Sequence, residues 1–266
     1  MDLGLTGKTV VILGATGGMG EEIARQFAKE GAKVVLAARD ENAVKALANE
    51  LGGIGVACDI TRPEQLEALM EKALAETGRL DVSLNAVGWS LLKPFLETTP
   101  DEIEKMMSLQ FKGPYQWMQA SVAAMKKAGN GGSIIQISSA TATLMMFDHA
   151  LYMGTKAGIN QVVRAVAEEF GADGIRANTI SPGVTFGTKM SADALPGVQD
   201  AFVPSYPLGR TGTVADIANA AVWVASDTCY MTGENFQVNG GLSLRRNPNQ
   251  QEFADSIGKA MAAQGA

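Results

Sequence analysis

Lys8-Thr-Val-Val-Ile-Leu13 is followed directly by Gly14-Ala-Thr-Gly-Gly-Met-Gly20, and this junction decides the fold. The first stretch is an apolar run of the kind that a buried parallel strand needs, and helically spaced Ile23 and Phe27 follow the second stretch. A tight glycine turn between a strand and a helix N-terminus makes a binding site for a pyrophosphate. The glycines are spaced GxxxGxG, which differs from the general dinucleotide fingerprint GxGxxG.

Strand-like and helical stretches alternate along the rest of the chain. Strand-like runs recur near 10–13, 34–37, 55–57, 82–84, 134–137, 177–180 and 236–238. Helical patterns separate them near 20–30, 41–50, 63–77, 100–127, 151–171 and 213–226. Such alternation predicts an α/β fold over 1–266: a single Rossmann-type domain with a doubly wound sheet of about seven parallel strands and helices on both faces. A ligand would then lie across the carboxyl ends of the strands.

The composition argues against nucleic acid, membranes and metal ions as partners of this chain. The 266 residues carry a net charge of −6, which offers no electrostatic footprint for nucleic acid or for an anionic membrane. No apolar stretch is long enough to span a bilayer, and Met-Asp-Leu-Gly at the start is no secretory signal, so we expect a cytoplasmic protein. The cysteines, Cys58 and Cys229, have no metal-ligand spacing, and we expect no metal site.

Tyr152 and Lys156 describe a proton-donating site. They are four residues apart in a helical pattern, so their side chains lie on one face. A free tyrosine has a pKa of about 10. A lysine cation beside it favours the phenolate, and we expect the pKa of Tyr152 to fall toward the working range. Ser139, at the end of the strand-like run before it, could polarise a substrate oxygen.

These features together resemble the classical subgroup of the short-chain dehydrogenase/reductase (SDR) family, over nearly the whole chain to about Leu244. The motifs occur in the family's order, and they are the Gly14–Gly20 loop (with Leu13 in place of the family's leading Thr), Cys58-Asp59-Ile60, Asn85-Ala-Val-Gly88, Ser139 with Tyr152 and Lys156, Ser181-Pro-Gly183 and Val238-Asn-Gly-Gly241. The resemblance implies an NAD(P)-dependent oxidoreductase that transfers a hydride to a ketone, with Tyr152 as the proton donor.

The resemblance also assigns the coenzyme contacts. By position they are Gly14, Thr16, Gly17, Gly18, Met19 and Gly20 at the pyrophosphate, Asp59 and Ile60 at the adenine, Asn85, Ala86 and Gly88 at the ribose region, Tyr152 and Lys156 at the nicotinamide ribose, and Pro182, Gly183, Val184 and Thr188 at the carboxamide. The spacing to Thr188 is one residue longer than in the family's PGxxxT, so Thr185 competes for that role.

The second strand predicts the choice of coenzyme. Val34-Val-Leu-Ala-Ala38 ends without the acidic residue that would bind a free ribose 2′-hydroxyl, and Arg39 follows. A guanidinium suits a 2′-phosphate, so NADP(H) is expected over NAD(H), although Asp40 opposes a phosphate. The alternative is that Arg39 only extends into solvent.

Gln110 is the main departure from the family's pattern. The family usually has an Asn in an NxxG context, where it links the lysine to solvent through a water, and here the stretch reads Gln110-Phe-Lys-Gly113. Glutamine keeps the amide chemistry, so we place Gln110 with the catalytic set. The alternative is a tolerated helix residue, with protons leaving by another route.

The substrate pocket is expected from apolar side chains at loop ends. The candidates are Trp89, Met146, His149, Phe186, Met190 and Phe202, several of them in a lid segment at 184–207. They suggest a small to medium apolar or alicyclic ketone, although half of them could instead be core or interface. For His149 a lining role is favoured over a second acid–base role. In the C-terminal extension, 242–266, apolar residues recur every four positions, and the tail could dock on a neighbouring subunit or be a loose end.

Three functions stay open. The leading one is an NADPH-dependent carbonyl reductase or alcohol dehydrogenase acting on a small-molecule ketone or alcohol. The alternatives are a 3-oxoacyl-thioester reductase, which would want a more basic rim than Lys126, Lys127 and Arg164 supply, and a non-catalytic NADP-binding sensor. An enoyl reductase is disfavoured because its Tyr–Lys spacing is typically wider. The helices at 100–127 and 151–171 usually pair across subunits in the family, which implies a homo-oligomer, a tetramer or a dimer.

Overall fold

The computed structural model describes residues 2–187 and 195–264. Its centre is a seven-stranded parallel sheet in the order β3-β2-β1-β4-β5-β6-β7, which confirms the predicted Rossmann-type fold. The strands lie where the alternating pattern predicted them: β1 (Thr9–Leu13), β2 (Lys33–Ala38), β3 (Ile54–Ala57), β4 (Val82–Asn85), β5 (Gly132–Ile137), β6 (Ile175–Pro182) and β7 (Asn235–Val238). Thr188 and Met190 lie outside the described residues.

Strand β1 shows how the sheet supports two cores. Its residues are all buried, and successive side chains point to opposite faces, as in any strand. Val10 and Ile12 therefore join one apolar cluster, and Val11 and Leu13 join the other. The strand order reverses between β1 and β4, where Leu13 lies beside Asn85. In a doubly wound sheet this reversal opens a crevice at the carboxyl ends of the strands.

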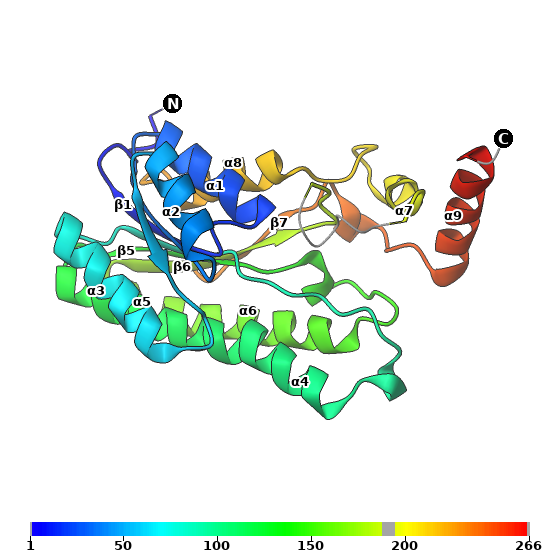
Figure 1. The fold of residues 1–266 in the computed structure, drawn as a ribbon, viewed down its shortest axis with the longest axis horizontal. Coiled ribbons are helices and arrows are strands. Elements are labelled where there is room, and N and C mark those ends of the chain that lie inside the picture. The colour runs from blue at the N-terminus through cyan, green and yellow to red at the C-terminus, as the bar shows by residue number, and fades with distance from the viewer. Residues whose placement is uncertain (1, 188–194, 265–266) are drawn as a thin grey trace.

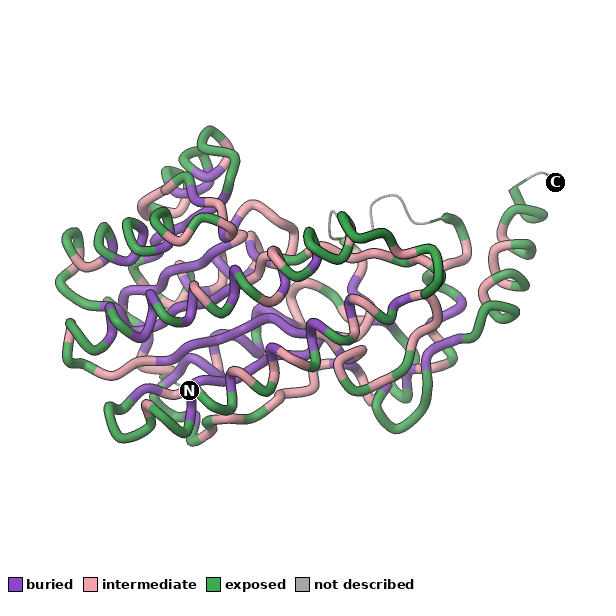
Figure 2. The backbone as a smooth tube through the Cα atoms, turned by 90° about the horizontal axis from the view of Figure 1, so that it is seen from below, coloured by how far each residue is buried: buried purple, intermediate pink, exposed green. Residues whose placement is uncertain are grey.

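Helices cover both faces of this sheet (Figure 1). Those over one face are α1 (Gly18–Lys29), α2 (Glu41–Glu50) and α8 (Val214–Ala225), and those over the other are α3 (Pro63–Thr77), α5 (Gly113–Ala128) and α6 (Ala150–Phe170). Figure 2 shows the buried residues gathered along the central strands and the inward sides of the helices. Within the described ranges, no helix has both the length and the apolar character needed to cross a membrane.

The helix predicted over 100–127 is divided. It consists of α4 (Pro100–Met107), a π-helical segment (Ser108–Lys112) and α5. The backbone N–H of Gly113 bonds to the carbonyl of Ser108, five residues back. A Cβ on Gly113 would lie only 2.8 Å from the carbonyl oxygen of Ile60, so only glycine fits this close approach. A π-helical turn of this kind often marks a functional site, and this one contains the buried Gln110.

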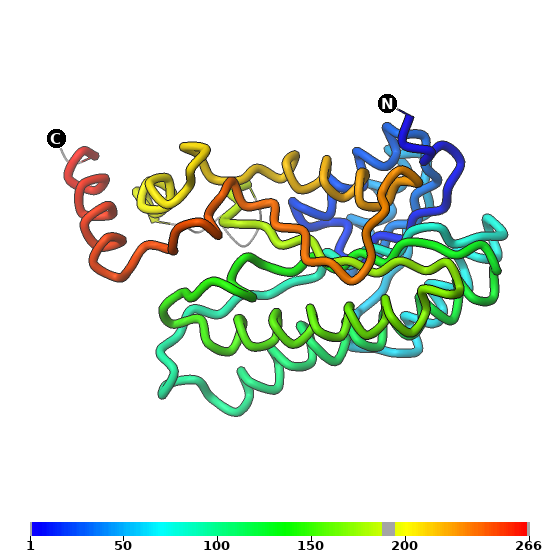
Figure 3. Tube along the Cα trace, turned by 180° about the vertical axis from the view of Figure 1, so that it is seen from behind, coloured from blue at the N-terminus to red at the C-terminus, as the bar shows by residue number. Residues whose placement is uncertain are grey.

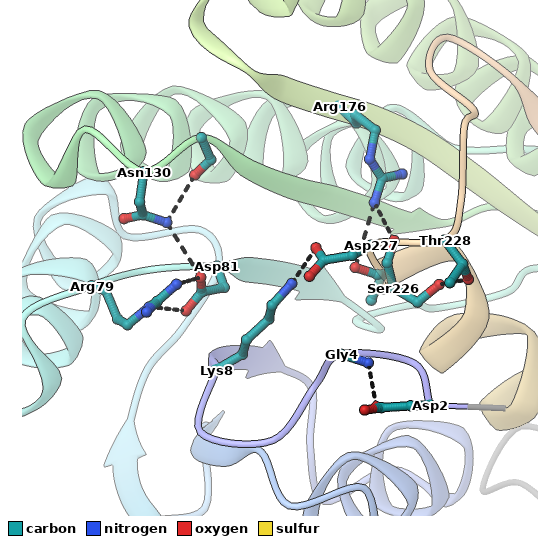
Figure 4. Close-up of polar contacts among 12 residues, drawn as sticks. Asp2, Gly4, Lys8, Arg79, Asp81, Asn130, Arg176, Ser226, Asp227 and Thr228 are labelled. Carbon is teal, nitrogen blue, oxygen red and sulfur yellow. Dashed lines mark hydrogen bonds and ion pairs between the residues drawn. The ribbon is translucent and has the colours of Figure 1, made fainter.

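The amino ends of the strands are tied together by charged side chains (Figure 4). Asp81, just before β4, accepts hydrogen bonds from the Arg79 guanidinium at 2.7 Å and from the backbone N–H of Thr9 at 2.8 Å. Lys8, just before β1, forms an ion pair with Asp227. These contacts fix the start of β1 against β4 and against the segment after α8.

The C-terminal extension packs on its own chain. Helix α9 (Gln250–Gln264) stands away from the sheet and lies beside the short helix α7 (Val198–Phe202), as Figure 1 and Figure 3 both show. The Phe253 ring meets the Phe202 ring edge-on with 5.0 Å between centroids. The Ser256 hydroxyl donates to the carbonyl of Gly197 at 2.8 Å. The tail is therefore not a loose end, and its partner is the expected lid segment of the same chain.

Candidate active site

A cavity of about 790 Å³ opens at the carboxyl ends of the strands, where the sequence placed the ligand. It brings together most of the predicted site residues: Gly14, Thr16, Gly17, Gly18, Met19, Gly20, Arg39, Asp59, Ile60, Ala86, Gly88, Trp89, Ser139, Met146, His149, Tyr152, Lys156, Pro182, Gly183, Val184, Phe186 and Phe202. Of the predicted site residues that the structure describes, Asn85 and Gln110 do not line it.

The glycine turn forms one end of the cavity. Gly14 has a φ of +83°, and a Cβ there would lie 2.8 Å from the backbone nitrogen of Val87. A Cβ on Gly20 would lie 2.2 Å from the carbonyl oxygen of Gly14, so a side chain at either position would force the turn apart. Helix α1 begins at Gly18 behind Gly17, which has no side chain to cap it. Its first amide groups therefore face the cavity unpaired by a cap, as a pyrophosphate site requires.

Helix α6 positions Tyr152 and Lys156 at the other end. Both side chains are buried, and the Lys156 ammonium lies 5.5 Å from the centre of the Tyr152 ring. Lys156 Nζ donates a hydrogen bond to the carbonyl of Ile137 at 3.0 Å, which leaves two of its three hydrogens for a ligand. Ser139 follows β5 in an extended conformation, and its hydroxyl lies 2.9 Å from that of Thr141. The three predicted catalytic residues thus meet at one place.

Burial sets the protonation of this site. It raises the pKa of the Tyr152 phenol to about 12, against a smaller opposite effect of the Ser139 hydroxyl. It lowers the pKa of the Lys156 ammonium to about 7. The expectation that Lys156 would lower the pKa of Tyr152 is therefore wrong for this arrangement, because burial dominates the pKa of the phenol and only the Ser139 hydroxyl opposes it. Tyr152 is fully protonated at neutral pH, which suits a proton donor.

Gln110 lies behind the cavity wall rather than in it. Its amide Nε2 donates to the backbone carbonyl of Trp89 at 2.6 Å, and the Trp89 ring lies under the Lys105 ammonium at 4.0 Å. Gln110 therefore holds the loop that carries Trp89. Its Oε1 is buried and has no hydrogen-bond partner among the described residues, so an additional donor such as a water would be needed to satisfy it.

Asn85 and Val184 also make contacts that the motifs did not reveal. The Asn85 amide donates to Gln136 at 2.9 Å and accepts from the backbone N–H of Val87 at 3.0 Å, so it shapes the turn after β4 from inside the sheet. The backbone N–H of Val184, expected at the carboxamide, donates to the Tyr206 hydroxyl at 2.7 Å. In this arrangement that N–H is already engaged.

Arg39 lies exposed at the end of β2, at the edge of the cavity. Within the part of the chain that the structure describes, its guanidinium forms no hydrogen bond or ion pair. The neighbouring Asp40 is turned away, because its Oδ1 accepts from the backbone N–H of Ala43 at 2.9 Å and caps helix α2. The opposition expected from Asp40 is thus reduced, although the charge of Arg39 also acts on the nearby carboxylate of Asp59.

The remaining wall of the cavity is mostly apolar and encloses the candidate substrate region. Trp89, Met146, Phe186 and Phe202 line it as predicted, with His149 beside Tyr152. Sequence reasoning missed several further lining residues: Ser90, Lys105, Thr141, Val198, Leu242 and Asn247. Asn247 lies in the C-terminal extension, where no motif marks it, and it is held by a hydrogen bond to the carbonyl of Met145 at 2.9 Å.

Comparison with known proteins identifies the family. The family model described as Enoyl-(Acyl carrier protein) reductase matches residues 14–243. The chain is 33% identical over 251 residues to D-threitol dehydrogenase of Mycolicibacterium smegmatis, an alignment that covers 92% of this chain and 96% of that protein. The chain belongs to the short-chain dehydrogenase/reductase family.

Two further SDR proteins show how the likeness extends. The 3-oxoacyl-(acyl-carrier-protein) reductase of Escherichia coli is 32% identical over 241 residues, covering 90% of this chain and 98% of that one. A crystal structure of a 3-ketoacyl-(acyl-carrier-protein) reductase from Brucella melitensis complexed with NADH is 29% identical, with a TM-score of 0.83 and coverage of 90% and 99%. As an SDR, this protein is an NAD(P)-dependent oxidoreductase acting on CH–OH groups.

Proposed function

We propose that this SDR reduces the ketone of a small to medium, largely apolar substrate with NADPH, and that it oxidises the alcohol in the reverse direction. The observation that carries the proposal is that Ser139, Tyr152 and Lys156 line the same cavity as the uncapped N-terminus of α1. Such a cavity provides a proton donor at one end and a pyrophosphate site at the other.

The residues of the site would divide the chemistry as follows. The nicotinamide, when bound, supplies the hydride. Lys156 Nζ, which keeps hydrogens free beside its bond to the Ile137 carbonyl, would hold the hydroxyls of the nicotinamide ribose. The Ser139 hydroxyl donates to the substrate carbonyl oxygen and positions it. Tyr152 Oη transfers its proton to the same oxygen as the negative charge develops there, and the proton is later replaced from solvent. In the reverse direction Tyr152 takes up the alcohol proton.

The preference for NADPH is supported by Arg39. Its guanidinium has no partner among the described residues, and the Asp40 carboxylate beside it is used to cap α2. A 2′-phosphate on the coenzyme would give Arg39 a bidentate partner, whereas NADH would leave the cation unpaired. Lys105 is a second cation near Arg39, in a small cavity of about 400 Å³ that the carboxylates of Asp59, Asp101 and Glu104 also line, so the proposal rests on Arg39 itself.

The substrate class follows from the wall around Tyr152. Trp89, Phe186 and Phe202 supply apolar contact area, and Thr141 and Asn247 supply polar groups at separate points. A substrate with an apolar body and few oxygens suits such a wall. The relatives include a D-threitol dehydrogenase, whose name indicates a polyol substrate. This supports a substrate of the present protein that carries oxygens beside the reacting one.

A 3-oxoacyl-thioester reductase is the second candidate, supported by the likeness to the Escherichia coli enzyme. The experiment that separates the two is a panel of cyclic ketones, aryl ketones, hydroxy ketones and an acetoacetyl thioester, each with NADPH and with NADH, followed by the absorbance of the reduced nicotinamide. We expect NADPH consumption with simple ketones. Turnover confined to the thioester would replace our proposal by the second candidate. Tight NADPH binding without any turnover would favour the non-catalytic sensor.

We also infer that the protein forms a homo-oligomer, either a dimer or a tetramer. Apolar side chains on the outer surface of α4 and α5 support this, since Ile103, Met107 and Tyr115 are 43%, 38% and 44% exposed. Light scattering of the purified protein measures the assembly, and a monomeric mass would contradict it.

A further inference from the structure

His149 is the chain's single histidine, and the structure places it against the proton donor. It lies three residues before Tyr152, at the N-terminal end of α6. The two rings pack with centroids 4.5 Å apart and an angle of 39° between their planes. Both side chains line the cavity. A molecule whose oxygen binds Tyr152 therefore lies near the imidazole.

The hydrogen bonding of His149 fixes its protonation. Nδ1 lies 3.0 Å from the backbone carbonyl oxygen of Leu91. A carbonyl oxygen can only accept, so Nδ1 carries the hydrogen of the ring. Burial lowers the pKa of the ring, against a smaller opposite effect of the Leu91 carbonyl, so the imidazole is neutral at pH 7. Nε2 then carries a lone pair, and no residue that the structure describes donates to it.

The backbone before His149 holds the ring in this place. Asp148 has a φ of +53°, and it is the only non-glycine residue with a positive φ in the described ranges. Its carbonyl accepts from the backbone N–H of Lys93 at 2.6 Å, and its carboxylate accepts from the Gln250 amide on α9 at 3.1 Å. Backbone in this region is unfavourable for most residues and persists where the surroundings enforce it, often at functional sites. The turn is thus fixed from two sides.

We propose that Nε2 of His149 accepts a hydrogen bond from a substrate hydroxyl on the carbon next to the reacting one, so that the preferred substrates are α-hydroxy ketones and the corresponding vicinal diols. The proposal rests on the proposed function, in which Tyr152 binds the reacting oxygen. The imidazole and the phenol lie ring against ring in the cavity wall, so the oxygen next to the one that binds Tyr152 is the substrate group nearest to His149. Nε2 can only accept, so it selects a hydroxyl, whereas a second carbonyl there would set two acceptors against each other.

The first test compares three substrates of one skeleton with the wild-type enzyme: the hydroxy ketone 3-hydroxybutan-2-one, the plain ketone butan-2-one and the diketone butane-2,3-dione. We expect kcat/KM for the hydroxy ketone to exceed that for the plain ketone by about tenfold, as one additional neutral hydrogen bond would give. The diketone should rank below the hydroxy ketone. Equal values for the hydroxy ketone and the ketone, or a preference for the diketone, would overturn this inference and leave the proposed function standing. No turnover of any carbonyl compound would overturn both.

Two variants make the test specific to Nε2. In His149→Asn the amide nitrogen can replace Nδ1 as the donor to Leu91, and no acceptor remains at the position of Nε2. In His149→Gln the amide oxygen can reach that position. We expect the ratio of kcat/KM between hydroxy ketone and ketone to fall toward one in His149→Asn and to be partly restored in His149→Gln. A ratio that stays at the wild-type value in His149→Asn shows that the ring only fills space. Coenzyme affinity shows whether each variant folds. If a variant does not fold, the comparison of the three substrates with the wild-type enzyme decides whether the inference holds.

Discussion

The charged side chains at the two ends of the same sheet differ in whether they have partners. At the amino ends of the strands, cations have partners: Arg79 binds Asp81, Lys8 pairs with Asp227, and Arg176 donates to four backbone carbonyls. At the carboxyl ends the Lys156 ammonium is buried with a single hydrogen bond, to a backbone carbonyl.

This difference between the two ends means that one end of the sheet serves stability and the other end serves function. Strand β1 and its neighbours carry ion pairs where the chain enters the sheet, and these hold the strands together without contact to the cavity. Where the strands end, Tyr152 and Lys156 both have perturbed pKa values because they are buried without a countercharge. Buried polar groups that lack partners lower the stability of the fold. The same groups are available to bind a ligand and to transfer protons.

The largest effect should come from removing the proton donor. Tyr152→Phe keeps the ring and deletes the hydroxyl, so kcat should fall by about 10³-fold, as expected for the loss of a general acid. Steady-state kinetics with a reducible ketone measures the loss, and coenzyme titration should show binding within a few-fold of wild type.

Tyr206→Phe is the matched control for this variant. Tyr206 is also buried with its pKa raised to about 12 by burial, but its hydroxyl bonds to the backbone of Val184 and it does not line the cavity. Its loss should change kcat far less than the loss of the Tyr152 hydroxyl. Equal effects of the two substitutions would remove Tyr152 from the mechanism.

A pair of lysine variants tests the comparison between the two ends directly. Lys156→Met should abolish most activity and yet raise the free energy of unfolding at pH 7 by a few kcal/mol, because a buried, poorly compensated ammonium is replaced by an apolar side chain. Lys8→Met breaks an ion pair with an exposed partner and should lower the free energy of unfolding by at most about 1 kcal/mol. Urea unfolding measures both. A loss of stability in Lys156→Met would contradict the contrast.

The pH dependence of the free energy of unfolding provides a second test of the buried Lys156. The pKa of Lys156 is about 7 in the folded protein, below the ordinary value of a lysine, about 10.4. Between these two values the unfolded chain binds more protons than the folded one. The contribution of Lys156 to stability therefore rises as the pH increases from 7 toward 10. The free energy of unfolding of the wild type should gain on that of Lys156→Met over this range, and a constant difference would exclude the shift.

The next effect concerns the exposed cation at the carboxyl edge. Arg39→Ala should weaken NADPH binding by about 10–100-fold, the value of charge-assisted hydrogen bonds to a phosphate, and leave NADH binding little changed. Dissociation constants for both coenzymes measure this. Lys45→Ala on α2 is a suitable control, because Lys45 forms a surface ion pair with Glu41 away from the cavity. Equal weakening of both coenzymes by Arg39→Ala would show that Arg39 does not recognise the 2′-phosphate.

The sequence predicted the sheet and the position of the site well, because both depend on local patterns. Apolar runs and glycine spacing are visible in the chain, and they placed the glycine turn, Tyr152 and Lys156 correctly at one edge. What depends on burial or on contacts between distant segments was not visible. The pKa of Tyr152 moved in the other direction, and the π-helical turn at Ser108–Lys112 depends on a close approach to Ile60. A motif assigns a residue to a position in the chain, but it does not show that the Asn85 side chain bonds to Gln136 within the sheet instead of lining the cavity.

The smallest expected effect concerns α9, which belongs to neither end of the sheet. From α9, Phe253 packs edge-on against Phe202 and Phe147. Phe253→Ala should leave the global free energy of unfolding nearly unchanged and speed amide hydrogen exchange in α9 and α7 by about tenfold, since a partly buried aromatic contact is worth about 1 kcal/mol beyond its area. Met261→Ala, at a position that is 59% exposed, is the control and should not change exchange in α7.

Because Phe202 lines the cavity and Phe253 does not, a change in KM without a change in kcat in Phe253→Ala would show that the tail supports the substrate wall. If α9 already exchanges freely in the wild type, the tail cannot hold that wall, and the cavity must keep its shape through α7 alone.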